Sequence, residues 1–395
     1  MAKKAREPKP LIVFYKDGTK RNLTRKENDE IAFEEFAYRE EIVKVIVPDD
    51  VEYIRTNAFF QCVALESVEL PEGLLEIEEG AFGNCQNLKS INLPFTVDTI
   101  GNSALSNCSS LKEIEIPARV AEIPEYFCCG CASLKKIYIP EGVYVIEKGA
   151  FMGTGIETAV FPESLRYIKE NAFHSAPLKK VIFANGKSNI GIVDQRAFHR
   201  TKIISEENAD KDGIVWMGNV LLKAYSTPKE LVINKINCTV ASGAFRNNST
   251  TETLKISDCF AVSPFAFLNS AIKELVVSGN YIAFHSFAIS SHEYELVEIF
   301  ADTAECSLNA FCDLTIRNRL LFKMRKDFTA CNEIVEDSKV SQLWFFTPER
   351  MSCSENTFNG LEVEFLYLLN METKTPEVFS VPDNEFLKTL IQPKS

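Results

Sequence analysis

Residues 58–127 decide the fold, because they repeat one pattern three times: AFFQCVALESVELPEGLLEIEEG (58–80), AFGNCQNLKSINLPFTVDTIGNS (81–103) and ALSNCSSLKEIEIPARVAEIPEYF (104–127). A large apolar residue and a cysteine recur every 23 residues, at Phe59, Phe82 and Leu105 and at Cys62, Cys85 and Cys108. We assign Tyr126-Phe127 to the next Ala-Phe position. A period in the twenties predicts a solenoid, because one such repeat cannot bury its apolar face alone.

The large residue after Ala, called the Phe position below, recurs along most of the chain. We assign it to Phe36, Phe59, Phe82, Leu105, Phe127, Phe151, Phe173, Phe198, Phe245, Phe267, Phe287, Phe311 and Phe358. The intervals 198–245 and 311–358 are twice the usual length and are interpreted as two coils each. The prediction is a β-rich repeat solenoid of about 14 coils of about 23 residues, capped at both ends.

Each coil is predicted to contain two short strands. The first follows the pattern Leu-x-x-Ile-x-Leu/Ile-Pro, as in residues 88–94, 111–117 and 134–140, and its alternation turns the apolar residues inward. The second is centred four or five residues before the Phe position, on Ile54, Ile77, Ile100, Ile123, Ile146, Ile168, Val193, Val240, Val262 and Ile282. The Ala-Phe-x-x-Cys-x-x-Leu arc is predicted to be a short helical or 3₁₀ turn. Asn84 and Asn107 are interpreted as turn residues that bond their own backbone.

This pattern resembles the BspA-type leucine-rich repeats, with the consensus I-P-x-x-V-x-x-I-x-x-x-A-F-x-x-C-x-x-L-x-x-I-x-I-P. Residues 71–94 and 94–117 carry it clearly, and the resemblance covers roughly residues 36–315. It implies a curved, right-handed, leucine-rich-repeat-like stack with no catalytic residues to carry over. Many proteins of this family are surface or secreted proteins that bind other macromolecules. This chain departs from them because no secretory leader is recognised at its start.

Four regions are predicted along the chain. Residues 1–10 are expected to be a disordered basic tail, and residues 11–35 an N-terminal cap with a strand at 11–15 and a tight turn at Asp17-Gly18. Residues 36–315 are expected to form the leucine-rich repeat solenoid, with a variant hairpin coil at 205–235 that turns at Gly218-Asn219. The pattern fades after Leu314, so residues 316–395 are expected to be degenerate repeats and a C-terminal cap.

Composition narrows the class of partner and the compartment. The net charge of −12 argues against nucleic acid as the main partner. No run of about 20 apolar residues exists, so no membrane span is predicted. Several of the 12 cysteines recur at one repeat position, which is typical of small buried residues in a reducing compartment and not of a disulfide framework. We expect a cytoplasmic protein, or a secreted or surface protein if a leader was removed before Met1.

Few residues could support catalysis. The chain has four histidines, His174, His199, His285 and His292, of which the first two recur by repeat position. No H-E-x-x-H, P-loop or G-x-S-x-G pattern is present. The densest thiol cluster is Cys128, Cys129 and Cys131, but a zinc site needs further ligands nearby, and we place Cys131 one residue off the cysteine position. We therefore expect no enzymatic activity, no metal and no other cofactor.

The outward positions of the first strands are more informative about binding. They change from acidic to mixed to more apolar along the chain. On three neighbouring coils they form our candidate partner-binding residues, Lys136, Tyr138, Thr158, Val160, Lys180 and Ile182. Tyr138, Val160 and Ile182 predict a small apolar strip flanked by lysines, which is typical of protein contact surfaces, although ordinary surface variation is the alternative interpretation. The hairpin with Trp216 and Met217 is a second candidate.

Three functions are weighed. The first hypothesis is a non-enzymatic scaffold that mediates protein–protein interaction through an exposed sheet face, with the partner and the oligomeric state left open. The alternative is an adhesin-like cell-surface protein that binds host or matrix macromolecules. An enzyme or metal protein is the third hypothesis, and the shortage of catalytic side chains disfavours it.

Overall fold

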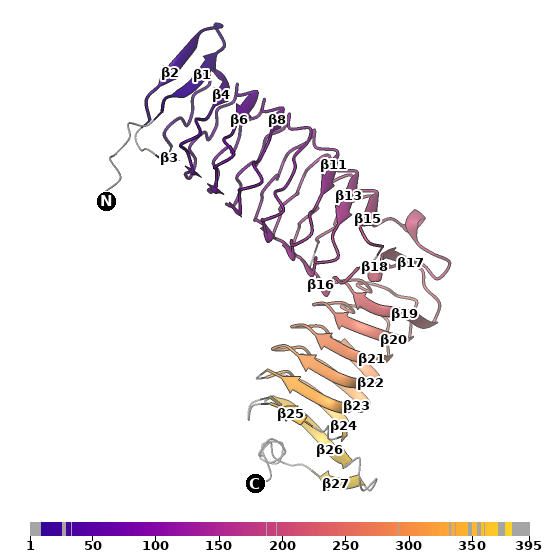
Figure 1. The fold of residues 1–395 in the computed structure, drawn as a ribbon. Coiled ribbons are helices and arrows are strands. Elements are labelled where there is room, and N and C mark those ends of the chain that lie inside the picture. Colours follow the sequence, from indigo (N-terminus) through magenta and orange to yellow (C-terminus); the bar gives the residue numbers. More distant parts are fainter. Residues whose placement is uncertain are drawn as a thin grey trace, which may run out of the picture. The chain divides into compact units, whose positions relative to one another are not determined.

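The fold is described from a computed structural model, which covers residues 9–380 apart from 26–28, 33, 187, 195, 291, 332, 336, 347–349, 354–356, 359 and 370–375. The predicted tail therefore lies almost wholly outside the described residues. The chain divides into two compact units (Figure 1). The first comprises residues 1–190 and 196–204, and the second comprises residues 191–195 and 205–395.

The first unit begins with a hairpin. Strands β1 (Leu11–Tyr15) and β2 (Lys20–Leu23) pair antiparallel and join through the predicted Asp17-Gly18 turn, where Gly18 has a φ of 83°. The other edge of β1 pairs antiparallel with β4 (Ile42–Ile46). From β4 onward the neighbouring strands of this sheet, β6 (Ser67–Glu69) and β8 (Ser90–Ile91), are parallel. The hairpin thus covers the sheet edge that the first coil would otherwise expose.

The remaining strands of the first unit form three further parallel ladders. The predicted second strands build the ladder β3 (Glu30–Ile31), β5 (Tyr53–Ile54), β7 (Glu76–Ile77) and β9 (Thr99–Ile100). They continue as β10 (Glu122–Ile123), β12 (Val145–Ile146) and β14 (Tyr167–Ile168). The first strands resume as β11 (Lys136–Tyr138), β13 (Thr158–Phe161) and β15 (Lys180–Phe183). The strand predicted at 111–117 is absent, although its residues keep the alternation of buried and exposed side chains.

The arc between the strands is a series of turns closed by hydrogen bonds from residue i+3 to residue i, which is the predicted 3₁₀ pattern without a continuous helix. Along the arc, backbone amides alternate between a hydrogen bond within the same coil and one to the next coil. Phe60 N–H donates to the carbonyl of Asn57 in its own coil, and Phe59 N–H donates to the carbonyl of Ala81 in the next coil. Asn84 and Asn107 are turn residues, with φ near 60°. Their side chains bond each other, because Asn107 Nδ2 donates to Asn84 Oδ1 at 3.0 Å, and not their own backbone as predicted.

The core of the first unit is a stack of identical residues. The rings of Phe36 and Phe59 lie 5.5 Å apart, and those of Phe59 and Phe82 lie 5.3 Å apart and almost parallel. Each repeat cysteine donates its thiol hydrogen to a carbonyl of the preceding coil, as Cys85 Sγ does to Phe59 at 3.2 Å. The repeat therefore buries its apolar side chains, and the Cys85 thiol adds a second hydrogen bond to an arc carbonyl that already accepts a backbone N–H.

The coil around residue 127 corrects our alignment by one residue. Leu105 N–H donates to the carbonyl of Phe127, the bond that Phe82 N–H makes to Ala104, so Phe127 occupies the Ala position and Cys128 the Phe position. Cys131 Sγ donates to the carbonyl of Leu105 at 3.2 Å, which places Cys131 at the ordinary cysteine position and not one residue off it. Two adjacent residues have exchanged sizes, and such a volume-conserving exchange keeps the core filled.

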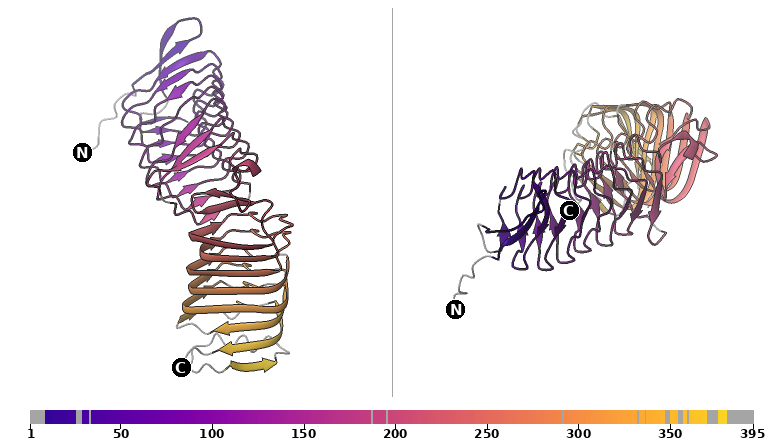
Figure 2. Two further views of the ribbon diagram at one scale, coloured as in Figure 1. Left: turned by 90° about the vertical axis from the view of Figure 1, so that its right-hand side faces the viewer. Right: turned by 90° about the horizontal axis from the view of Figure 1, so that it is seen from above.

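The second unit contains much longer strands. After β16 (Ile192–Val193) and the 3₁₀ helix η1 (Glu206–Asn208), β17 (Ile214–Met217) and β18 (Val220–Ala224) form the predicted hairpin, which turns at Gly218-Asn219. A parallel ladder follows through β19 (Glu230–Val240), β20 (Thr253–Val262), β21 (Glu274–Phe284), β22 (His292–Cys306), β23 (Leu314–Ala330), β24 (Ser338–Phe346) and β26 (Leu361–Leu369). β25 (Arg350–Ser352) pairs with β23, and β27 (Pro376–Ser380) pairs antiparallel with β26. Figure 2 shows the long strands stacked as parallel rungs.

One coil of the second unit was assigned with an offset of two residues. Val262 pairs with Phe284, so Phe284 and not Ile282 continues the second-strand position. Ile289 N–H then donates to the carbonyl of Ala310, which gives the Phe position to Ile289 and not to Phe287. Because side chains alternate with a period of two, the offset left the inward face unchanged and the sequence pattern could not reveal it. The ladder continues beyond Leu314, and the prediction of a β solenoid of about 14 turns is confirmed.

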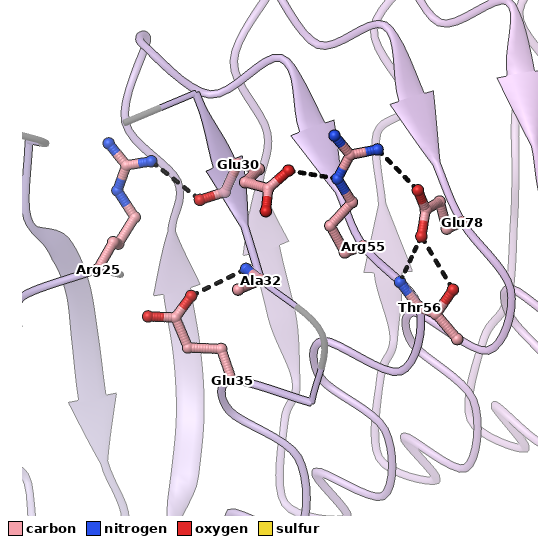
Figure 3. Close-up of polar contacts among 7 residues, drawn as sticks. All are labelled: Arg25, Glu30, Ala32, Glu35, Arg55, Thr56 and Glu78. Carbon is pink, nitrogen blue, oxygen red and sulfur yellow. Dashed lines mark hydrogen bonds and ion pairs between the residues drawn. The ribbon is translucent and has the colours of Figure 1, made fainter. Parts of the chain in front are cut away.

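A row of charges joins the first coils of the first unit (Figure 3). The guanidinium of Arg55 lies between two carboxylates: Nε bonds Glu30, and Nη1 donates to Glu78 Oε1 at 2.7 Å. Glu78 Oε2 also accepts hydrogen bonds from the Thr56 N–H and hydroxyl at 2.8 and 2.9 Å. Arg25 donates to the carbonyls of Lys9 and Glu30 and pairs with a carboxylate at 2.7 Å, that of Asp50. These bonds connect the N-terminal hairpin region to the first coils.

We expect Glu78→Gln to lower stability in a pH-dependent way. Burial alone would raise the pKa of Glu78, but the hydrogen bonds from Arg55 and Thr56 outweigh it and hold that pKa below its ordinary value of 4.5. The stabilisation is therefore fully present above pH 4.5 and is lost as the pH falls through the lower folded pKa. Urea unfolding should show a loss of about 1–2 kcal/mol at pH 7 that shrinks toward pH 3. Glu115→Gln, at an exposed position, is the control, and a loss that grows in acid would contradict the assignment.

Candidate functional site

The structure places the six candidate residues on one small sheet. Strands β11, β13 and β15 are parallel and lie side by side (Figure 1). The register aligns Tyr138 with Val160 and Val160 with Ile182, so these three form one row across the sheet. Lys136, Thr158 and Lys180 form a second row in the same register. We call the six residues the β11–β15 face.

Packing beneath the sheet orients this face. Ile137, Ala159 and Phe161 alternate with the face residues and are almost fully buried. The Phe161 ring lies 5.7 Å from that of Phe173, so the inward side of β13 is anchored on the phenylalanine stack. Because neighbouring side chains of a strand point to opposite sides, burying the first set presents the second set to solvent.

The face is apolar along one row and cationic along the other. Tyr138 is 53% exposed and Ile182 is 38% exposed, whereas Val160 between them is half-buried. Neither Lys136 nor Lys180 forms an ion pair with a described residue. The neighbouring Lys179 is different: its ammonium donates to Glu157 at 2.8 Å, and that hydrogen bond lowers the pKa of the Glu157 carboxyl. The face therefore carries two uncompensated positive charges beside an apolar strip.

Three of the four histidines make contacts within the stacked coils. His174 and His199 stack on each other in neighbouring coils, with ring centroids 5.1 Å apart. Partial burial lowers the pKa of His174, and the nearby His199, Arg200 and Arg196 lower it further. In the second unit His292 bonds the carbonyl of Ile272 at 2.7 Å, so this ring packs within the coil. These contacts are structural, and His174 and His199 recur because the repeat recurs.

The thiol cluster is mostly buried. Cys128 and Cys131 are inaccessible, and burial raises the pKa of Cys128 well above its ordinary value. Cys129 is half-buried, and burial raises its pKa too. A thiol must ionise to act as a nucleophile or a metal ligand, so this environment opposes both uses. Within the described residues, no group of three or more His, Cys, Asp or Glu side chains could hold a metal ion.

Sequence reasoning missed a hollow of about 470 Å³ in the second unit. The residues that line it come from four successive strands, β20 to β23, and include Asp258, Ser278, Asn280, Phe300, Lys323 and Arg325. No local motif joins residues so far apart in sequence. The available signal was Gly279-Asn280 inside a strand-like run, because such a pair marks a bend.

Comparison with known families identifies the repeat. A family model described as "BspA type Leucine rich repeat region" matches in six copies, over residues 29–157, 121–211 and 144–273. Together these matches cover more than half of the chain. The chain belongs to the BspA-type leucine-rich repeat family. The resemblance read from the repeat consensus is confirmed, and the BspA-type pattern accounts for the stacked Phe and Cys positions.

Solved structures similar to this BspA-type chain include three leucine-rich repeat proteins from bacteria. One from Bacteroides ovatus is 19% identical, with 87% of this chain and 82% of that chain covered and a TM-score of 0.45. A leucine-rich cell surface protein from Faecalibacterium prausnitzii is 19% identical over 78% of this chain and 89% of that chain, with a TM-score of 0.39. A T. pallidum leucine-rich repeat protein is 27% identical over 35% of this chain and 69% of that chain, with a TM-score of 0.35.

No curated protein matches this chain. In the part of the chain that the structure describes, no helix has the length and apolar content needed to cross a membrane.

Proposed function

We propose that this chain is a non-enzymatic scaffold that binds a protein partner through the β11–β15 face. The observation that carries the proposal is the alignment of Tyr138, Val160 and Ile182 in one row, beside a second row with two lysines. Membership of a repeat family supports a binding role, because stacked repeats present extended surfaces.

The chemistry of the face favours a partner with an apolar segment next to acidic side chains. Tyrosine contributes a large contact area with few rotatable bonds, so its burial at an interface costs little conformational entropy. Lys136 and Lys180 have no described ion-pair partner that a ligand would need to displace. Such rim charges accelerate association with an acidic surface.

The test compares crosslinking and affinity capture by the natural chain with capture by Tyr138→Ala/Val160→Asp/Ile182→Asp. We expect the triple variant to lose its captured partner, because it buries new negative charge in the contact. Ser90→Asp, at an exposed position of β8, is the matched control and should capture as the natural chain does. Thermal melts of all three proteins show whether the fold is retained. Identical partner sets for the triple variant and the natural chain would contradict the proposal.

Cytoplasmic and cell-surface locations lead to different partners for this scaffold. Fractionation of native cells and N-terminal sequencing of the protein distinguish the two locations. A cleaved leader together with a surface location would favour the adhesin-like alternative.

A further inference from the structure

We infer that the hollow on strands β20–β23 is a binding site for a hydroxylated monocarboxylate, of which a uronic acid is the simplest example. This site lies in the second unit and is separate from the β11–β15 face. Its volume of about 470 Å³ is in the range of small-ligand pockets, about 300–1,000 Å³.

A bulge creates the cationic side of the hollow. The register between β22 and β23 shifts between Ala301 and Thr303, and two residues of β23 oppose the single residue Asp302. Arg325 Nε contacts Asp302 Oδ1 at 2.8 Å, and Lys326 Nζ lies 3.3 Å from Oδ2. Bulges of this kind redirect side chains and are frequent beside functional sites.

The ion pair with Asp302 leaves most of the Arg325 guanidinium group unused. It engages Nε, and no other polar partner of Arg325 is found among the described residues. The two terminal nitrogens remain free to donate in parallel, which is the geometry that a carboxylate accepts best. Arg325 is largely exposed at the hollow, and its terminal nitrogens are available to a carboxylate there.

Lys323 supplies the second positive charge. It stands in register between Phe300 of β22 and Phe346 of β24, and its ammonium lies 5.1 Å from the centroid of the Phe346 ring. The ring positions the ammonium without neutralising it, and no carboxylate of the described chain pairs with it. Two cations thus line one side of a small hollow.

The side of the hollow opposite the two cations would bind hydrogen-bond donors of a ligand. Asp258 on β20 is three strand spacings from β23, which is about 14 Å between backbones, and the side chains shorten that gap. Its exposed carboxylate accepts hydrogen bonds, and the amide of Asn280 can both donate and accept. A ligand ammonium would be repelled by Lys323 and Arg325 in so small a space, whereas hydroxyl groups carry no such penalty.

An apolar surface lies between the two polar sides. Phe300 is half-buried and lines the hollow together with Ala301. The backbone comes close here because Gly279 has no side chain: a Cβ atom at that position would lie 2.3 Å from the carbonyl oxygen of Cys259. The electron-rich face of an aromatic ring suits the C–H groups of a sugar ring. The carboxylate of a uronic acid would then contact the two cations, its sugar ring would contact Phe300, and its hydroxyl groups would contact Asp258.

Isothermal titration of the full chain with sodium glucuronate, sodium galacturonate, glucose and inorganic phosphate tests the inference. We expect at least one uronate to bind, and glucose and phosphate to bind at least tenfold more weakly. Lys323→Gln should weaken uronate binding at least tenfold. Lys339→Gln should not, because Lys339 lies on β24, outside the hollow, and pairs with Glu362 at 3.0 Å.

Asp258→Ala separates recognition of hydroxyl groups from simple charge attraction. If Asp258 accepts hydrogen bonds from the ligand, uronate binding weakens in this variant. If it only repels the carboxylate, binding strengthens, and that result would overturn the inference. Three further results would overturn the inference. They are equal affinity for phosphate and uronate, no binding of either uronate, and unchanged uronate binding in a folded Lys323→Gln protein.

Discussion

Phe82→Ala is expected to lower the free energy of unfolding by about 3–5 kcal/mol. Phe82 is completely buried, and its ring stacks on that of Phe59 at 5.3 Å with the planes 2° apart. Removing the ring leaves a cavity in the middle of a stack, where coils on both sides are held in register and cannot collapse into the space. Urea unfolding followed by circular dichroism measures the loss.

Glu115→Ala is the matched control for Phe82→Ala. Glu115 lies one coil further along the same unit at an exposed position and belongs to no described ion pair. Its replacement should change the unfolding midpoint by no more than the experimental error, as is usual for isolated surface positions. Equal effects of the two substitutions would contradict the assignment of the Phe position to the core.

The second large effect is expected at Phe127 and Cys128, where the repeat exchanges a small and a large residue. Phe127→Ala should cost about 3–5 kcal/mol, because the completely buried ring contacts Phe151 at 6.4 Å edge to face. Cys128→Phe alone should cost about 1–3 kcal/mol, because it adds a ring to a filled core. The double variant restores the usual Ala-Phe order, so we expect it to be more stable than Phe127→Ala alone.

A double-mutant cycle on urea unfolding measures the coupling between Phe127 and Cys128. Neighbours that share one space in the core show interaction energies of about 0.5–3 kcal/mol, and here the sign should favour the double variant. Strictly additive losses would mean that the two side chains fill separate spaces, and the exchange of positions would then be wrong. The pair Phe59→Ala/Phe60→Ala is the control from a regular coil, where no exchange of sizes exists.

The period of 23 residues predicted most of the fold because each coil meets the same constraint. A Phe and a Cys recurring at that interval can only be buried by stacking on their equals, and they do so from Phe36 through Phe82. The errors arose where the constraint tolerates more than one alignment. Phe127 and Phe287 were assigned to the Phe position because of their residue type. The position is in fact defined by the hydrogen bonds between coils.

The two candidate sites differ in how much of each could be predicted from the sequence. The β11–β15 face lies at fixed repeat positions, so its residues could be chosen from the alternation of the strands, and the parallel register aligns them. The hollow could not be found in this way. Asp258, Asn280 and Arg325 occupy bends and a bulge where the register shifts, and a periodic pattern carries no information about such shifts.

The sequence by itself determined the solenoid, its period, the inward residues and the family. The reason is that every coil must bury the same apolar face, so the same residue types recur in each repeat. The tertiary structure alone decided which residues of neighbouring coils touch. It set the exchange at Phe127 and Cys128, the bond between Asn84 and Asn107, and the meeting of Arg325 with Asp302. The physical reason is that contacts between coils depend on register and bulges, which result from the packing of whole strands against one another.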